Sequence, residues 1–158
     1  MKILVAVDGS KYSDAAVDEI VQRPWPEGSQ VRVVTALEYP VATGTPMMRG
    51  AEVWALPPEY FEEVEKAIRE GAEAFIGKAV EKLRSAKELE VSSEILNGSP
   101  KRVIIEAAEA WGADLIVVGS RGLGAWSRLL LGSVSLAVAS HARCSVLISR
   151  RRGGSNED

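Results

Sequence analysis

The stretch Gly119–Ser133, which reads GSRGLGAWSRLLLGS, decides the fold and indicates where a ligand would bind. It follows the strongly apolar run Leu115–Val118 and precedes Val134–His141, a run that suits a helix. It is therefore a strand-to-helix connection, and it carries four glycines. Glycine permits positive φ angles and close approach of a ligand to the backbone. Consecutive N–H groups beside a helix N-terminus form an anion site, so we expect this connection to hold phosphate groups.

Outside this stretch, short apolar runs alternate with segments of helical character. The predicted strands are residues 2–7, 30–37, 90–96, 114–118 and 145–149, and the predicted helices are residues 11–23, 57–87, 100–111 and 133–142. The alternation predicts an α/β fold, a three-layer sandwich around a five-stranded, mainly parallel open sheet.

Helix starts and one long amphipathic segment support these assignments. Ser10, Ser99 and Ser133 are expected to be N-cap residues, with Pro100 at the first position of its helix. In the long helix an apolar residue recurs every three or four positions, which predicts one buried stripe. The stripe consists of Phe61, Val64, Ile68, Ala72, Phe75, Ala79 and Leu83.

Length and composition limit the classes of protein that the chain can represent. With 158 residues, we expect one domain over residues 1–150 and a disordered tail over 151–158. A formal net charge of −3 argues against a nucleic-acid binder, and no apolar run is long enough for a signal peptide or a membrane span. The single cysteine, Cys144, excludes an internal disulfide and a cysteine-cluster metal site. The expectation is a cytoplasmic protein without membrane or nucleic-acid partners.

Two loops at strand ends are candidates for chemistry. In open α/β sheets, ligands bind outside the carboxyl ends of strands where the strand order reverses. Asp8-Gly9-Ser10 follows the first strand, and the glycine-rich stretch follows the fourth. If these two strands are neighbours, Asp8 and Gly119 line one crevice.

The spacing of the glycines excludes two common nucleotide motifs and matches a third. The stretch contains neither GxxxxGK[ST] nor GxGxxG, so it is not a P-loop or a dinucleotide fingerprint. It reads Gly-x-x-Gly, nine residues, then Gly-Ser, from Gly119 to Ser133. With KILVAVDGS at the start, GSPKRVIIEAAEAWGADLIVVGSRG in the middle and LLGSVS and VLIS later, it resembles the ATP-binding universal stress proteins. The resemblance covers almost the whole chain except residues 39–56 and the last eight, and implies a Rossmann-like fold of the adenine nucleotide alpha hydrolase type.

The resemblance also implies roles for individual residues around an ATP molecule with Mg²⁺ or Mn²⁺. The adenosine side would be held by Ala6, Val7 and Asp8, with Ala36 against adenine. Val118 and Gly119 would line the ribose, and Gly122 would lie against the phosphates. Phosphate binding through backbone N–H groups and a hydroxyl would involve Gly132, Ser133 and Val134, and Arg121 is a further candidate for phosphate contact. No catalytic residue and no protein metal ligand is expected.

Each of these features also has a purely structural interpretation. In that interpretation, Asp8-Gly9-Ser10 forms a turn and a helix cap and has no further role. The glycines then serve close packing alone, and Arg121 is a solvated loop residue. The irregular loop from Tyr39 to Leu56 could cover the site or meet a partner.

Three functions follow from these interpretations. The first is a regulatory stress-response protein that holds ATP, with at most weak hydrolysis because Asp8 is the only obvious carboxylate at the site. The others are an ATP-cleaving enzyme on a similar fold, which often carries an SGGxDS-like loop that is absent here, and a nucleotide-free interaction module. The family commonly dimerises through its last strand, so Val146, Leu147 and Ile148 are the expected homodimer contact. Family members often have proline where this chain has Ser145 and valine where it has Ser149.

Overall fold

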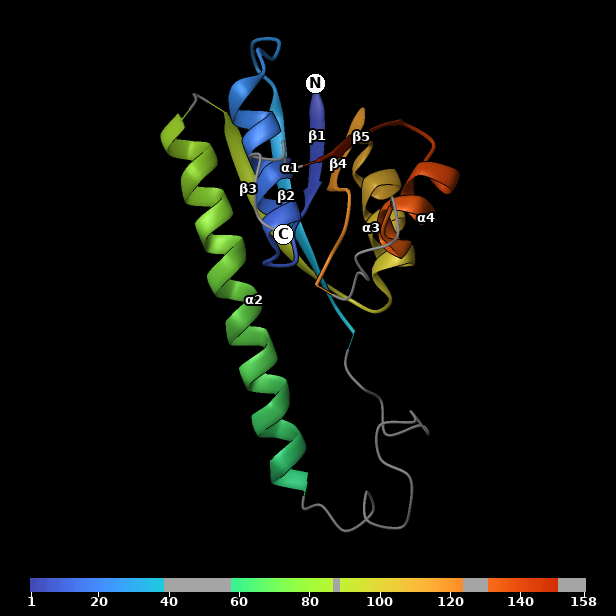
Figure 1. Cartoon of the computed structure of the whole chain (residues 1–158). Helices are drawn as coiled ribbons and strands as arrows, with labels where there is room; N and C mark the ends of the chain where they lie inside the picture. Colours follow the sequence, from blue (N-terminus) through green and yellow to red (C-terminus); the bar gives the residue numbers. More distant parts are fainter. Residues whose placement is uncertain (39–57, 87–88, 124–130, 151–158) are drawn as a thin grey trace, which may run out of the picture.

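A computed structural model of the chain shows five strands in one sheet (Figure 1). The residues that the structure describes are 1–38, 58–86, 89–123 and 131–150. The strands are β1 (Lys2–Ala6), β2 (Gln30–Leu37), β3 (Glu90–Asn97), β4 (Leu115–Gly119) and β5 (Ser145–Ser149). Their order is β3-β2-β1-β4-β5 and all four pairings are parallel, which confirms the predicted open parallel sheet.

Four helices cover the two faces of this sheet and complete a three-layer α/β sandwich. They are α1 (Lys11–Gln22), α2 (Pro58–Ala86), α3 (Pro100–Trp111) and α4 (Ser133–His141). Helices α1 and α2 pack on one face, and α3 and α4 on the other (Figure 1). None of the described helices combines the length and apolar character needed to cross a membrane.

The strand order reverses between β1 and β4, the arrangement on which the predicted crevice depended. Ala6 of β1 lies opposite Val34 of β2 on one side and Val118 of β4 on the other. The loops that follow β1 and β4 therefore emerge side by side at the carboxyl edge of the sheet. The predicted neighbourhood of the Asp8 loop and the glycine-rich stretch is confirmed.

The central strands β1 and β4 are mainly apolar, as expected for strands whose two faces are both covered. Ile3 and Val5 belong to the core under α1 and α2, whereas Leu4 belongs to the core under α3 and α4. All five residues of β4 are buried. These two cores hold the carboxyl ends of β1 and β4 in fixed positions beneath the site.

Helix α2 forms the predicted stripe mainly in its second half. Ala72, Ala79 and Leu83 are buried, and Ile76, which the predicted stripe omitted, is buried with them. Val64 and Ile68 are only half-buried, and the first part of α2 extends past the strand ends (Figure 1). The side chain of Phe61 and residues 39–56 lie outside what the structure describes.

Two of the three serines predicted to be N-cap residues occupy that position, and one of these two makes a side-chain capping bond. Ser10 caps α1, since its Oγ accepts a hydrogen bond from the N–H of Ser13 at 3.2 Å. Ser99 occupies the N-cap position of α3, but its side chain makes no capping bond. The prediction that Ser133 caps the next helix is wrong: Gly132 is the N-cap and Ser133 is the first helical residue. The physical reason is that the Gly132 carbonyl already accepts the first helical hydrogen bond, from Leu136 at 3.0 Å.

The remaining differences are shifts of one residue at element ends. Strand β1 ends at Ala6 instead of Val7, and β4 runs one residue later than predicted at both ends. The expected tail over 151–158 lies outside the described residues.

Candidate functional site

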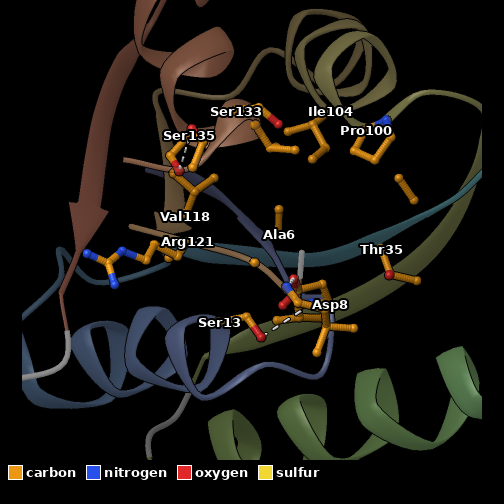
Figure 2. Close-up of a pocket in the computed structure, with 17 residues that line it drawn as sticks. Ala6, Asp8, Ser13, Thr35, Pro100, Ile104, Val118, Arg121, Ser133 and Ser135 are labelled. Carbon is orange, nitrogen blue, oxygen red and sulfur yellow. Dashed lines mark hydrogen bonds between the residues drawn. The ribbon is translucent and has the colours of Figure 1, made fainter. Parts of the chain in front are cut away.

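A cavity of about 410 Å³ opens at the carboxyl ends of β1, β2 and β4 (Figure 2). This volume lies within the range of ligand pockets, about 300–1,000 Å³. The structure brings together around it every residue of the predicted site: Ala6, Val7, Asp8, Ala36, Val118, Gly119, Arg121, Gly122, Gly132, Ser133 and Val134. Residues from four separate segments of the chain therefore meet at the topological switch point.

Asp8 connects the two loops of the site through its carboxylate. One oxygen, Oδ1, accepts a hydrogen bond from the N–H of Ser10 at 3.1 Å, which shapes the turn into α1. The other, Oδ2, accepts from the N–H of Leu123 at 3.1 Å, in the loop after β4. The bond to Ser10 thus confirms that Asp8 acts as a turn residue. The bond to Leu123 adds a link across 115 residues of sequence.

Close contacts favour glycine at the end of β4 and in the loop that follows it, and each glycine meets a different neighbour. A Cβ atom on Gly119 would lie 2.5 Å from the carbonyl of Tyr12, in the first turn of α1. A Cβ atom on Gly122 would lie 2.6 Å from Oδ2 of Asp8, and one on Gly132 would lie 3.2 Å from Cα of Arg121. The glycines therefore allow the loop to fold tightly against α1 and Asp8, and they leave a backbone-lined cradle at the cavity.

The N-terminus of α4 lies at the cavity without a side-chain cap. The N–H of Gly132 donates to the carbonyl of Ser120 at 2.7 Å, so this group is not available as the predicted phosphate donor. Within the described residues, the N–H groups of Ser133 and Val134 have no acceptor. Such groups at a helix N-terminus carry partial positive charge and attract anions. The cradle and these two donors fit a phosphate-bearing ligand.

Arg121 lines the cavity, but its guanidinium group points away from Asp8 and Ser133 (Figure 2). Nη1 donates to the hydroxyl of Tyr12 at 3.4 Å, and Cζ lies 5.7 Å from the centre of the Tyr12 ring. A contact between this guanidinium and a phosphate therefore requires a rotamer different from the one in this structure.

Six further residues line the cavity that the sequence did not single out: Ser13, Thr35, Pro100, Ile104, Leu123 and Ser135. Ser135 lies in the motif LLGSVS, and its Oγ donates to the carbonyl of Ser120 at 3.0 Å. Thr35 directly precedes Ala36, so the role predicted for Ala36 was a sequence signal that Thr35 could also lie at the site. Pro100 and Ile104 line the cavity because α3 packs on β2. No local sequence pattern predicts that contact.

The cavity lining is poor in groups that catalyse reactions. Among the described residues that line it, Asp8 is the one carboxylate, and none is a histidine or a lysine. Among the described residues, no group of three or more His, Cys, Asp or Glu side chains could hold a metal ion. The arrangement can therefore bind and orient a ligand, but the lining supplies no partnered acid–base pair.

Comparison with known proteins places the chain in a family. The model of the universal stress protein family matches residues 1–150. The chain belongs to the universal stress protein family. Universal stress protein YxiE of Bacillus subtilis is 31% identical over 149 residues, which cover 94% of this chain and 98% of that protein. The structure of universal stress protein UspA from Lactobacillus plantarum is 26% identical, with a TM-score of 0.76, and covers 95% of this chain and 97% of its own.

Two further solved structures of universal stress proteins contain nucleotides. One is a universal stress protein in complex with cAMP, 26% identical over 94% of this chain and 95% of that chain, with a TM-score of 0.60. The other is an Arabidopsis thaliana family protein with AMP bound. It is 20% identical with a TM-score of 0.63, covers 97% of this chain and 93% of its own, and supports the fold alone.

Proposed function

We propose that this universal stress protein is a regulatory, nucleotide-holding protein that binds ATP in the cavity at the β1–β4 switch point. The observation that carries the proposal is the meeting of the Asp8 loop, the glycine cradle and the uncapped N-terminus of α4 around one cavity. The cAMP complex of a relative with 26% identity supports an adenine nucleotide as the ligand class. Nucleotide-dependent changes in conformation or subunit contact would then carry the stress-response role.

In this proposal each wall of the cavity takes one part of the nucleotide. Ala6, Val7 and Asp8 hold the adenosine side, and Ala36 contacts adenine. Val118 and Gly119 line the ribose, while the cradle at Gly122 accommodates the phosphates. The N–H groups of Ser133 and Val134 and the Ser133 hydroxyl would bind phosphate oxygens. Mg²⁺ or Mn²⁺ would be coordinated chiefly by the phosphates and would shield their charge.

Binding without efficient hydrolysis follows from the chemistry of the lining. Efficient hydrolysis requires a group that positions or deprotonates the attacking water. Asp8 is the one carboxylate among the described lining residues, and both of its oxygens accept backbone hydrogen bonds, from Ser10 and Leu123. We therefore expect at most weak turnover and favour the holding function over an ATP-cleaving enzyme. Rapid, substrate-dependent release of phosphate or pyrophosphate would reverse this preference.

The protein is further proposed to form a homodimer through β5. Ser145 donates its N–H to Asp114, and Ser149 accepts from Ser120, so these residues direct their backbone groups toward the β4 side of the sheet. The N–H and C=O groups of successive residues in a strand point to opposite sides of the strand. Those of Val146 and Ile148 therefore point outward, to the edge of the sheet. A second copy can pair with this edge.

Titration of the full chain with Mg-ATP tests the proposed function. We expect saturable heat by isothermal titration calorimetry and a rise in melting temperature, since a ligand at 100 times its Kd stabilises the folded state by about 2.7 kcal/mol. Mass spectrometry of protein purified without added ligand should detect co-purified adenine nucleotide. Absence of both heat and thermal shift at millimolar Mg-ATP would contradict the proposal.

A nucleotide-free interaction module is the second candidate, and the glycines give it a specific basis. Gly119 and Gly122 are each required by contacts within the chain, with or without a ligand. If ATP never binds and dimer formation survives substitution of Gly122, this candidate replaces the first.

A further inference from the structure

We propose that the hydroxyl of Thr35 binds the base of the nucleotide and accepts a hydrogen bond from the 6-amino group of adenine. The proposal rests on the proposed function, because it names a residue that reads the ligand of the same cavity. Thr35 belongs to β2 and lines the cavity (Figure 2).

The Thr35 hydroxyl is a buried polar group without a partner. The residue is only 2% exposed, and no described residue forms a hydrogen bond with its hydroxyl. Among the described residues, no buried side-chain polar atom is both sealed from the surroundings and unpartnered. The Thr35 oxygen must therefore keep access to the space beside it, and that space is the cavity. Without a ligand this hydroxyl can bond only to water in the cavity, so a ligand that displaces the water has to supply a hydrogen-bonding group in its place.

The position of Thr35 within the sheet selects the base as the part of the ligand that reaches it. Ala6 lies opposite both Val34 and Val118, so Thr35 and Gly119 follow at the same level on β2 and β4. They are two strands apart, and each strand spacing is about 4.8 Å, so their separation is roughly 10 Å. Gly132 and Ser135 both donate to the carbonyl of Ser120, which directly follows β4, so the phosphate donors at the start of α4 lie near the end of β4. A nucleotide whose phosphates lie at α4 therefore extends its base toward β2.

The walls near Thr35 suit a base that is apolar on its faces and polar at its edge. Pro100 and Ile104 of α3 provide an apolar surface on one side of the sheet edge. Thr35 projects from β2 on the other side, where Asp8 and Ser13 also lie (Figure 2). Ser13 is already engaged, since its Oγ donates to the carbonyl of Ser10 at 2.9 Å. Each oxygen of Asp8 already accepts one backbone hydrogen bond. On this side of the cavity, Thr35 carries the hydroxyl that has no partner among the described residues.

Substitution of Thr35 by valine, which has nearly the same shape, tests this role in the full chain. A hydrogen bond between neutral groups contributes enough that its loss weakens binding about fivefold. We expect Thr35→Val to weaken Mg-ATP binding about fivefold by calorimetry, whereas Thr35→Ser, which keeps the hydroxyl, restores most of the affinity. Unchanged affinity in Thr35→Val would overturn the inference while leaving the proposed function intact. Failure of the unmodified chain to bind ATP would contradict the proposed function itself.

Two more measurements separate contact with the amino group from other roles. The 5′-triphosphate of purine riboside carries hydrogen in place of the 6-amino group, so Thr35→Val and the unmodified chain should bind it within about twofold of each other. If Thr35→Val lost the same amount of affinity for both ligands, the proposed contact would be overturned. Without ligand, Thr35→Val should melt at or above the temperature of the unmodified chain, because no internal hydrogen bond is lost. A clear fall in melting temperature would reveal a structural partner and would also overturn the inference.

Discussion

At the scale of single residues, the glycines of the loop after β4 differ in what they make possible. The Cβ atom of a larger residue at Gly119 would meet the backbone of α1, which cannot move without displacing the helix. At Gly122 the obstacle is the end of the Asp8 side chain, which can rotate. Substitution at Gly119 therefore threatens the fold, whereas substitution at Gly122 displaces a functional group.

Gly122→Ala should consequently impair binding more than folding. The new methyl group forces Oδ2 of Asp8 away and breaks its hydrogen bond to Leu123, a bond to a charged group worth about 1.5–3 kcal/mol. We expect at least about tenfold weaker Mg-ATP binding by calorimetry and a decrease of about 1–2 kcal/mol in the free energy of unfolding.

Gly71→Ala is the matched control for this substitution. Gly71 lies within α2, and a Cβ atom there meets nothing within 4 Å. Alanine is favoured over glycine in a helix, so this variant should gain up to about 1 kcal/mol and bind ATP normally. ATP affinity that is equal in Gly122→Ala and Gly71→Ala would show that the position of Asp8 is unimportant.

Cys144 offers a second test at this scale, through its ionisation. Burial raises the pKa of the Cys144 thiol above its ordinary value of 9.0, and the charge of Asp114 raises it further, while backbone hydrogen bonds oppose the change. Since the folded state holds the proton more tightly, the resulting stabilisation is complete below the pKa of the unfolded chain. It is lost as the pH rises through the folded pKa.

The rate of alkylation by iodoacetamide as a function of pH measures this pKa directly. The thiolate is the reactive form, so the midpoint for the native protein should lie above that for the protein in urea. Cys144→Ser, which has no thiol, measures the background reaction of iodoacetamide with other groups. A native midpoint at or below the denatured one would contradict the assigned burial effect.

At the scale of elements, α4 begins without a side-chain cap, which leaves backbone N–H groups free to bind an anion. The turn before it is held by hydrogen bonds to the Ser120 carbonyl from Gly132 at 2.7 Å and from Ser135 at 3.0 Å. This arrangement fixes the helix start against the end of β4 and leaves the N–H groups of Ser133 and Val134 directed to the site. A helix dipole whose positive end is not capped favours an anion there.

Ser133→Asp should therefore have opposite effects on stability and on binding. A negative charge in the first turn stabilises a helix by about 0.3–1 kcal/mol, which corresponds to about 1–3 °C in melting temperature for a chain of this size. The same charge repels phosphates, and we expect about tenfold or greater loss of ATP affinity.

Ser133→Asn separates charge from the loss of the hydroxyl, because asparagine is neutral and of similar size to aspartate. It should weaken binding far less than Ser133→Asp. If the aspartate variant binds Mg-ATP as well as the unmodified chain, the phosphates do not lie at α4.

At the scale of the whole molecule, the open edge of β5 is the surface on which the proposed assembly depends. The strand keeps its place in the sheet through β4 and through the buried Ser149, whose hydroxyl donates to the carbonyl of Ala15 at 2.9 Å. This bond gives Ser149 a structural role in holding β5 against α1. The outward backbone groups of Val146 and Ile148 remain for a partner.

Val146→Pro should convert a dimer into a monomer without unfolding the subunit. Proline removes an outward N–H and is tolerated on edge strands. We expect the mass measured by light scattering to fall from that of two chains to that of one, with an unchanged circular dichroism spectrum. A monomeric unmodified protein, or a dimeric Val146→Pro variant, would contradict pairing through β5.

The sequence by itself determined the order of strands and helices, the parallel sheet and the two loops at the site, and its resemblance to the family implied eleven of the residues that line the cavity. The elements depend on local periodicity and on mainly apolar buried strands, and the resemblance depends on the spacing of glycines within one loop. The tertiary structure decided what depends on residues distant in the chain. It placed β1 beside β4, joined Asp8 to Leu123, brought Pro100 and Ile104 into the cavity wall, and engaged the N–H of Gly132 with Ser120. It also turned Arg121 toward Tyr12 and left the Thr35 hydroxyl unpaired, because hydrogen-bond partners are set by packing between elements and not by the residues alongside in sequence.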